Sequence, residues 1–413
     1  MKIKVAIINE RADASLGGAE RSAFELVEAL KQEGINVDLL AATGKETENI
    51  KILFANRETR RAGFYAFGKA LQKIIPQNRY DIIHSFLPFD FADVYQPRGG
   101  AYPEAIIRNA ASFQNKFVDG FKRLTAYANF RRTVLLRAER KLCRRQDGPV
   151  IAALSNYVAE QFKKYYGVGG ERVVVILNGV KIHAMPDARH GRAVLQTRSK
   201  ILNEFGIKDS ETARQKDGGS STRQKDGGSS TSVFLFAANN FRLKGLAVLL
   251  EAFYLATKQN ANPSFLIVAG RGNRQKYLAR ARQLGIERKI AFIEAPGDLR
   301  IISAAADAAV LPTFYDPSSR FILEMLSMGK PVITTRYNGA AEQFTNNVHG
   351  RIIDEPGDIE ALAKAIVYFA DKENSQKAAN AIVADNIPQS VSISRVAKSL
   401  ISLYETILEK KKR

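Results

Sequence analysis

Two carboxylates, Asp316 and Glu324, stand with seven residues between them at the entry to a predicted short helix. Pro317 and Ser318 mark the helix start, because proline suits a first turn and a serine hydroxyl can accept a backbone N–H. A loop of small polar residues that leads into a helix exposes unpaired N–H groups at a positive dipole end, which suits a phosphate. The carboxylates can accept hydrogen bonds from sugar or ribose hydroxyls. The spacing indicates a sugar-nucleotide site, although acidic residues near helix starts are commonly only caps.

The residues after Glu324 extend this pattern, because Gly329 and Pro331 end the helix and a strand begins at Val332. The segment resembles the signature of the retaining, family-four glycosyltransferases of the GT-B fold. That signature is a Glu, seven residues, a second Glu, a small residue, Gly, any residue, Pro and a strand. Asp316 stands at the first Glu and is one methylene shorter. The resemblance implies that Asp316 orients the donor sugar, that Glu324 binds the ribose, and that four residues between them contact the donor: Ser318, Ser319, Arg320 and Phe321.

A second candidate site is the basic turn Asn239–Gly245, which joins a predicted buried strand to a helix and contains Arg242 and Lys244. Lysine and arginine at such a turn can grip a diphosphate, lysine as a point charge and arginine as a fork. The resemblance implies that both residues neutralise the donor diphosphate. It also implies that the donor base stacks near Ala295 and Pro296.

The chain begins with an apolar strand, Lys2–Asn9, a glycine turn at Gly17 and Gly18, a helix, and a second strand, Val37–Ala41. This order is typical of a doubly wound α/β domain. Glycines at the carboxyl end of the first strand let backbone N–H groups approach a ligand, but many α/β proteins turn on glycine for packing only. The resemblance implies that this loop faces the donor phosphates and the acceptor.

His84 lies near the carboxyl end of a predicted strand, Tyr80–Phe86. A lone strand histidine is more often structural than catalytic, but the resemblance implies a histidine in this region, which makes His84 a secondary catalytic candidate. In the loop that follows, Asp93-Val94-Tyr95 and Tyr102-x-Glu104 resemble the bacterial lipopolysaccharide-core (heptose) glucosyltransferase branch of the family. Its acceptor-side candidates are Arg98, Gly99 and Gly100; Arg98 suits a phosphorylated acceptor, and an exposed structural arginine is the alternative.

The formal net charge is +20, from 62 basic and 42 acidic residues, which indicates an anionic partner. Residues 101–145 contain eleven of the basic and only three of the acidic residues, with aromatic and aliphatic side chains at three- and four-residue intervals. A helix with this pattern favours an anionic membrane surface. A core-facing helix with a solvated basic back is the alternative, and nucleic acid is less expected because no recognised binding motif accompanies the charge.

Composition excludes several classes of site. One cysteine, Cys143, permits no internal disulfide. The four histidines are scattered without metal-ligand spacing, and the sequence contains no Asp-x-Asp motif that could bind a metal ion. The N-terminal apolar run is too short for a signal peptide core, and no run approaches the roughly 20 apolar residues of a membrane span. We therefore expect no metal or cofactor, and a cytoplasmic protein peripheral to the inner face of the membrane.

The sequence thus predicts an α/β protein with two Rossmann-like doubly wound domains of the GT-B fold facing across a donor cleft. The N-terminal domain spans 1–180, with a helix at 392–409 crossing back onto it; the nucleotide-sugar domain spans 233–391. Residues 181–232 form a linker that holds a tandem duplication, RQKDGGSST, with no assigned chemistry. The resemblance implies retaining, metal-independent transfer of a hexose, from a UDP-sugar above others, to a membrane-linked glycan such as lipopolysaccharide core. A transferase with another lipid or small acceptor, a sugar-nucleotide epimerase and a nucleic-acid-binding protein stay as alternatives.

Overall fold

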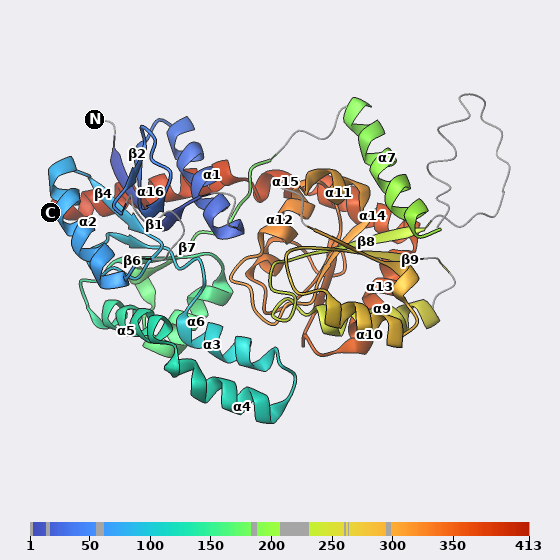
Figure 1. Cartoon of the computed structure of the whole chain (residues 1–413). Helices are drawn as coiled ribbons and strands as arrows, with labels where there is room; N and C mark the ends of the chain where they lie inside the picture. The colour runs from blue at the N-terminus through green and yellow to red at the C-terminus, as the bar shows by residue number, and fades with distance from the viewer. Residues whose placement is uncertain are drawn as a thin grey trace. The chain divides into compact units, whose positions relative to one another are not determined.

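The computed structural model describes most of the chain, namely residues 3–13, 17–54, 62–182, 188–206, 231–259, 262, 264–294 and 299–412. The chain divides into two compact units, each built on its own parallel sheet (Figure 1). Unit 1 contains Met1–Lys181, Asp316–Arg320 and Ser390–Arg413; unit 2 contains Ile182–Tyr315 and Phe321–Gln389. The two parallel α/β sheets confirm the predicted fold class.

In unit 1 the described residues form a seven-stranded parallel sheet in the order β3-β2-β1-β4-β5-β6-β7. Its strands are β1 Lys4–Ala12, β2 Asn36–Gly44, β3 Ile50–Ile52, β4 Ile82–Ser85, β5 Val94–Tyr95, β6 Val150–Ala153 and β7 Val173–Val175. Its helices are α1 Gly18–Gln32, α2 Phe64–Asn78, α3 Tyr102–Ala111, α4 Lys116–Thr125, α5 Phe130–Arg144, α6 Asn156–Tyr166 and α16 Ile393–Lys412.

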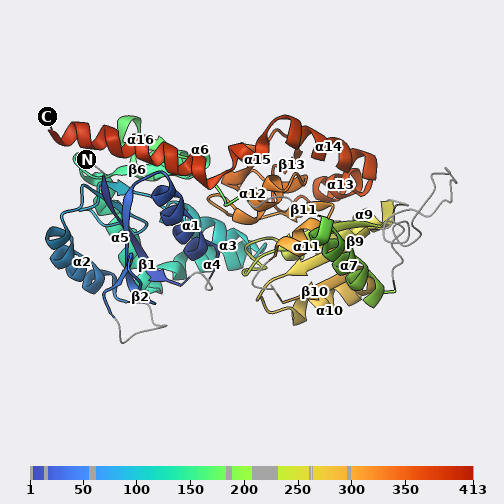
Figure 2. The same cartoon turned by 90° about the horizontal axis from the view of Figure 1, so that it is seen from above.

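Strand β1 shows why helices cover both faces of this sheet. Side chains alternate along a strand, so Val5 and Ile7 join one core with α1 and α16, while Ala6 and Ile8 join another with α2. Helix α16 runs alongside α1, as Figure 2 shows from above. Near-continuous burial of a strand is typical of a parallel sheet covered on both sides.

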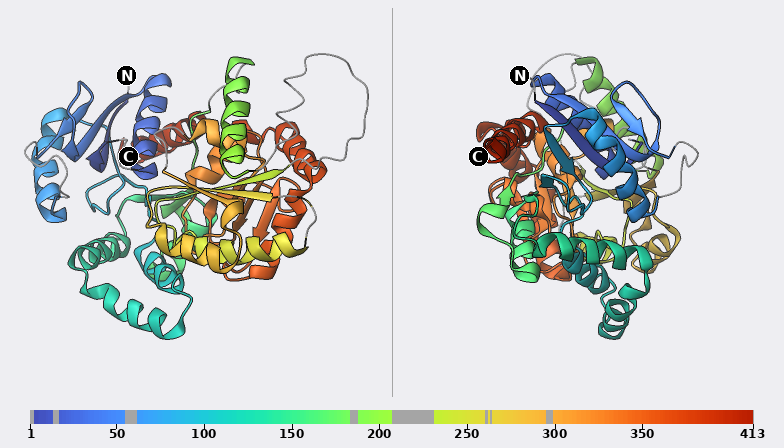
Figure 3. Two further views of the ribbon diagram at one scale, coloured as in Figure 1. Left: turned by 45° about the vertical axis from the view of Figure 1, so that its right-hand side comes forward. Right: turned by 90° about the vertical axis from the view of Figure 1, so that its left-hand side faces the viewer.

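In unit 2 the described residues form a six-stranded parallel sheet in the order β10-β9-β8-β11-β12-β13. Its strands are β8 Ser232–Ala237, β9 Ser264–Ala269, β10 Ile290–Ile293, β11 Ala308–Leu311, β12 Val332–Thr335 and β13 Gly350–Ile353. Its helices are α7 Ala188–Glu204, α9 Leu246–Gln259, α10 Gln275–Gln283, α11 Arg300–Ala305, α12 Arg320–Ser327, α13 Ile359–Ala370 and α14 Lys372–Ala384. The first residue of α12, Arg320, belongs to unit 1, and a short helix, α15 Ile387–Ser390, leads out of unit 2. Helices α9 and α13 pack together on one face, and α7 packs with α11 on the other (Figures 1 and 3).

Both sheets reverse their strand order next to the first strand, between β1 and β4 in unit 1 and between β8 and β11 in unit 2. Ligands of open parallel sheets bind outside the carboxyl ends of the strands at such reversal points. The loops after β1, β8 and β11 are the ones that contain Gly17, Lys244 and Asp316. The predicted loops after β1, β8 and β11 thus lie where parallel sheets bind ligands.

Candidate functional site

The loops that follow β8 and β11 are joined by several contacts within unit 2. The Lys244 Nζ donates to the Tyr315 carbonyl oxygen at 3.0 Å, and the Phe314 N–H donates to the Leu243 carbonyl oxygen at 2.9 Å. Gly245 has a φ of +81°, and a Cβ there would lie 2.0 Å from the Pro312 carbonyl oxygen. Only glycine fits this close approach, so it brings the lysine loop against the chain that leads into Asp316.

The segment after Tyr315 turns sharply into α12. The Asp316 Oδ1 accepts the Ser318 N–H at 3.2 Å, and Ser318 and Ser319 are only 6% and 4% exposed. The predicted role of the Ser318 hydroxyl as a helix cap is wrong: its Oγ is buried and has no hydrogen-bond partner among the described residues. The turn is made by the aspartate carboxylate instead, which leaves the serine hydroxyl available to another group.

Two predicted donor residues follow on α12. Phe321 is buried with Ile322 and Leu323 in the core of unit 2, so its side chain belongs to the packed face of the helix. Glu324 lies on the same helix and is half-buried. The seven-residue spacing thus separates a turn carboxylate from a helix carboxylate, as the sequence predicts.

Unit 2 also contains a cavity of about 700 Å³ beside the carboxyl ends of β9 and β10. Its lining includes Phe241, Arg271, Gly272, Arg274, Phe292 and Glu294. A Cβ on Gly272 would lie 2.5 Å from the Phe241 ring, so glycine keeps the loop close to this aromatic wall. These residues were not among the predicted site residues, although the Gly270-Arg271-Gly272 turn directly after a buried strand is a signal for them in the sequence.

Arg242 precedes Lys244 in the same turn, and burial lowers its pKa, with the nearby Tyr277 acting in the opposite direction. Ala295, Pro296 and nearly all of the duplicated RQKDGGSST segment lie outside the described residues.

His84 is fully buried on β4 in unit 1. Its Nδ1 lies 2.6 Å from the Tyr404 hydroxyl on α16, and burial lowers its pKa to about 3, with Arg98 adding to the effect. Its Nε2 has no hydrogen-bond partner among the described residues. The imidazole is therefore neutral at physiological pH, which limits it to hydrogen bonding there and rules out a role as a resident cation.

The acceptor-side candidates lie in the same region of unit 1. The Arg98 guanidinium stacks 4.3 Å from the centre of the Phe86 ring and donates to the Ser22 hydroxyl of α1. Burial lowers the pKa of Arg98, and the charge of Arg320 adds to this, but a guanidinium stays protonated at neutral pH. Gly99 is exposed, and Gly100 closes a tight turn with a φ of +68°.

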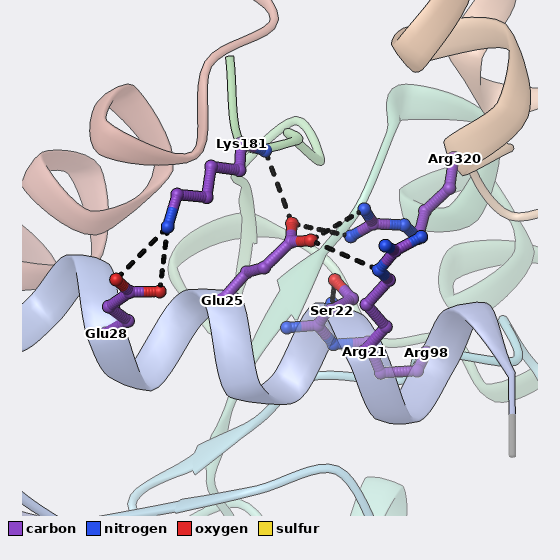
Figure 4. A network of polar contacts seen from close by, with 7 residues as sticks. All are labelled: Arg21, Ser22, Glu25, Glu28, Arg98, Lys181 and Arg320. Atoms are coloured by element: carbon purple, nitrogen blue, oxygen red, sulfur yellow. Dashed lines mark hydrogen bonds and ion pairs between the residues drawn. The ribbon is translucent and has the colours of Figure 1, made fainter. Parts of the chain in front are cut away.

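The glycine turn before α1 lies close to one of the predicted donor residues. A Cβ on Gly18 would meet the Cδ of Arg320 at 3.4 Å, while Gly17 begins the helix without a side-chain cap. The Arg320 guanidinium bonds Glu25 of α1 (Figure 4). Unit 1 thus brings together Gly18, Arg98 and Arg320 around α1, while unit 2 brings together the Lys244 turn and the end of β11.

The basic region 101–145 forms three helices, where the sequence pattern suggested one continuous amphipathic helix. Helix α4 has no buried residue, which is the opposite of a core-facing helix. Its exposed large side chains and those just after it are Phe117 (90%), Phe121 (61%), Leu124 (76%), Tyr127 (58%) and Phe130 (81%). Lys116, Lys122 and Arg123 flank them, and Figure 3 shows α4 at the outer end of the helices of unit 1, beyond α3 and α5.

Two negative findings apply to the described residues. No helix there has the length and apolarity needed to cross a membrane. No group of three or more histidine, cysteine or acidic side chains in the same residues is placed to hold a metal ion.

Two family models match this chain in succession. Residues 16–183 match Glycosyltransferase Family 4, and residues 221–383 match Glycosyl transferases group 1. The lipopolysaccharide glucosyltransferase WaaG of Escherichia coli is 20% identical over 85% of both chains. A crystal structure of WaaG, a glycosyltransferase involved in lipopolysaccharide biosynthesis, covers 97% of this chain and 99% of its own at 16% identity, with a TM-score of 0.72.

A structure of Anabaena Alr3699/HepE in complex with UDP and glucose is also similar, with a TM-score of 0.64 and 16% identity over 98% of this chain and 100% of that one. These structural likenesses support the fold, while the two family models between them span most of the sequence. The chain therefore belongs to the retaining family-four glycosyltransferases of the GT-B fold, which use nucleotide sugars as donors.

Proposed function

We propose that this enzyme transfers glucose from UDP-glucose to a membrane-linked glycan of the lipopolysaccharide-core type. The contact that carries the proposal is the bond from Lys244 to the Tyr315 carbonyl, because it holds a cation next to the segment that begins at Asp316. WaaG supports the acceptor class, and the UDP and glucose bound to HepE support the donor class.

The donor diphosphate would be held without a metal ion. Lys244 and Arg242 supply positive charge, and the Ser318 and Ser319 N–H groups at the start of α12 supply oriented dipoles. The Ser318 Oγ, buried and without a partner among the described residues, can donate to a phosphate oxygen. Asp316 would orient the glucose hydroxyls, and Glu324 would accept hydrogen bonds from the ribose.

The nucleoside would occupy the 700 Å³ cavity of unit 2, where Phe241 and Phe292 offer aromatic surface and Arg271 offers a donor. A cavity of this size suits a nucleoside, since small-molecule sites measure about 300–1,000 Å³. Ala295 and Pro296 directly follow Glu294 of its lining in the sequence, and we keep them as base contacts.

Charge stabilisation of the leaving UDP would carry most of the rate. As the sugar–phosphate bond breaks, negative charge grows on the β-phosphate, and preorganised contacts favour that charge. The acceptor hydroxyl attacks the anomeric carbon on the face that UDP leaves, and the departing phosphate oxygen takes the hydroxyl proton. Retention follows from this same-face exchange without a protein nucleophile. Arg98, Gly99 and Gly100 would face the acceptor, and His84, which is fully buried, would act there only through hydrogen bonds.

The first experiment measures glucose transfer with Lys244→Ala and Glu324→Ala against a panel of nucleotide sugars. Loss of one preorganised contact costs about 3 kcal/mol of transition-state stabilisation, so each variant should lose roughly a hundredfold in kcat/KM. Lys258→Ala, at the end of α9, is the matched lysine control and should keep wild-type rates. Full activity of both site variants would refute the assignment.

An epimerase is the alternative enzyme. It would convert the nucleotide sugar without an acceptor, whereas a transferase releases free UDP only when an acceptor is present. Measuring UDP release with and without a glycan acceptor separates the two. A nucleic-acid-binding protein would instead give salt-sensitive gel shifts and no nucleotide-sugar binding.

For the acceptor membrane, we propose that α4 docks on an anionic bilayer from the cytoplasmic side. The exposed apolar side chains after Lys116 would enter the interface, and each flanking basic residue would add about 1 kcal/mol near anionic lipid. The variant Phe117→Ser with Leu124→Ser should lose binding to phosphatidylglycerol vesicles while keeping activity on a water-soluble acceptor.

The matched control for α4 is Tyr65→Ser on α2, whose side chain is 61% exposed, as that of Phe121 is. It should bind vesicles as the wild type does. Vesicle binding that survives in the α4 variant would exclude α4 as the docking helix.

A further inference from the structure

Glu25, in the second turn of α1, is the centre of a polar network in unit 1 (Figure 4). Its Oε2 and Oε1 accept from the two outer nitrogens of Arg320 at 2.8 and 2.9 Å. Both side chains are only 12% exposed. The carboxylate also accepts the Lys181 N–H at 3.2 Å and lies 3.8 Å from the Arg21 Nε.

Arg320 is the last residue of the segment Asp316–Arg320, which other side chains of unit 1 also contact by hydrogen bonds. The Ser155 Oγ donates to the Pro317 carbonyl oxygen at 3.0 Å, and the Asn178 Nδ2 donates to the Ser318 carbonyl oxygen at 3.3 Å. Glu25 then binds Arg320 two residues later. Three separate parts of unit 1 thus fasten residues 317, 318 and 320, on both sides of Ser319.

The Glu25–Arg320 pair has the geometry that best fixes an orientation. A two-bond fork between a guanidinium and a carboxylate permits little rotation, and low exposure protects it from solvent competition. By contrast, the carbonyl contacts from Ser155 and Asn178 are single neutral hydrogen bonds. Glu25 therefore adds a charged, two-bond anchor at the first residue of α12, next to the two backbone contacts.

We propose that Glu25 is a positioning residue for the donor diphosphate, acting through Arg320 on the N–H groups of Ser318 and Ser319. This role rests on the proposed function, in which those N–H groups bind the diphosphate. Arg320 then contributes to the donor site by its position and not as a phosphate ligand, because both of its outer nitrogens already bond Glu25. The sequence alone implied direct donor contact for Arg320.

The test is a double-mutant cycle with Glu25→Gln, Arg320→Met and the double variant, measured by donor KM, kcat and calorimetric UDP binding. Misplacing a binding group can cost up to about a hundredfold, so each single variant should raise donor KM and UDP Kd roughly 10- to 100-fold. The donor KM and UDP Kd of the double variant should be no higher than those of the more impaired single variant, because both changes break the same interaction. Arg320→Lys, which keeps the charge but loses the fork, should fall between wild type and Arg320→Met.

Glu28→Gln is the matched control, since it removes the same charge one turn along α1. Glu28 pairs with the Lys181 Nζ at 3.1 Å through side chains that are 52% and 44% exposed. It should leave donor KM, kcat and UDP binding within twofold of wild type.

Several outcomes would overturn the proposal. Unchanged UDP affinity in Glu25→Gln would do so, as would additive effects in the double variant. A lower melting temperature with reduced kcat and unchanged donor KM would show a merely structural role. If the wild type itself binds no UDP, the proposed function fails first; if it binds UDP and Glu25→Gln binds equally well, only the positioning role fails.

Discussion

Replacing Glu139 by glutamine should change how the stability of unit 1 depends on pH. Glu139 is fully buried on α5, and its carboxylate accepts from the Tyr95 hydroxyl at 2.8 Å, the Tyr166 hydroxyl at 2.6 Å and the Tyr102 N–H at 2.9 Å. Burial raises its pKa from 4.5 to about 7, although these hydrogen bonds act to lower it. The bond to Tyr102 holds the start of α3, directly after the loop that contains Arg98, Gly99 and Gly100.

The sign follows from the raised pKa. The folded state binds the Glu139 proton more tightly than the unfolded state does. The contribution of this proton to the free energy of unfolding is therefore fully present below pH 4.5 and is lost as pH rises to about 7. One pKa unit corresponds to about 1.4 kcal/mol, so the wild type should lose about 3 kcal/mol from this group over that interval. Glutamine keeps the shape, can still accept hydrogen bonds and does not ionise.

Urea unfolding followed by circular dichroism at pH 5, 6, 7 and 8 measures this difference. The free energy of unfolding of Glu139→Gln relative to wild type should rise with pH by about 3 kcal/mol and level off above pH 7. Glu160→Gln, on neighbouring α6 and exposed, is the control and should give a curve parallel to wild type. Parallel curves for Glu139→Gln as well would refute a buried carboxyl that titrates near neutrality.

Two further predictions concern Gly245 and His84. Gly245→Ala should destabilise unit 2 by about 3 kcal/mol, because the φ of Gly245 is +81° and the new Cβ would lie 2.0 Å from the Pro312 carbonyl oxygen. Thermal unfolding measures this loss. The control is Gly285→Ala, where φ is similar but the space is open, and it should lose only about 1–2 kcal/mol. His84 has a pKa lowered to about 3, so its stability contribution is present above pH 6.5 and is lost as pH falls through the acid range. Between pH 7 and pH 4, His84→Gln should therefore lose less of its free energy of unfolding than the wild type loses. An equal loss in the two proteins would contradict this prediction.

The strand and helix pattern was predictable because it depends on local periodicity. Buried parallel strands such as β8 (Ser232–Ala237) read as continuous apolar runs, and glycine turns mark where several of them end. The spacing of Asp316 and Glu324 was also readable, since the residues are close in sequence and belong to a family motif. The exposure of α4 was not readable, because an apolar stripe has the same periodicity whether it faces a core or solvent.

Sequence by itself therefore determined the family, the two parallel sheets and the types of residue in the motif. Tertiary structure alone decided which distant groups meet. Glu25 and Arg320 are 295 residues apart, and His84 and Tyr404 are 320 apart, so no local pattern could pair them. The His84–Tyr404 contact exists because α16 packs against α1 and shares a core with β1 and β4. The physical reason is that periodicity encodes which face of an element is apolar, while the partner of a buried charge depends on the packing of the whole unit.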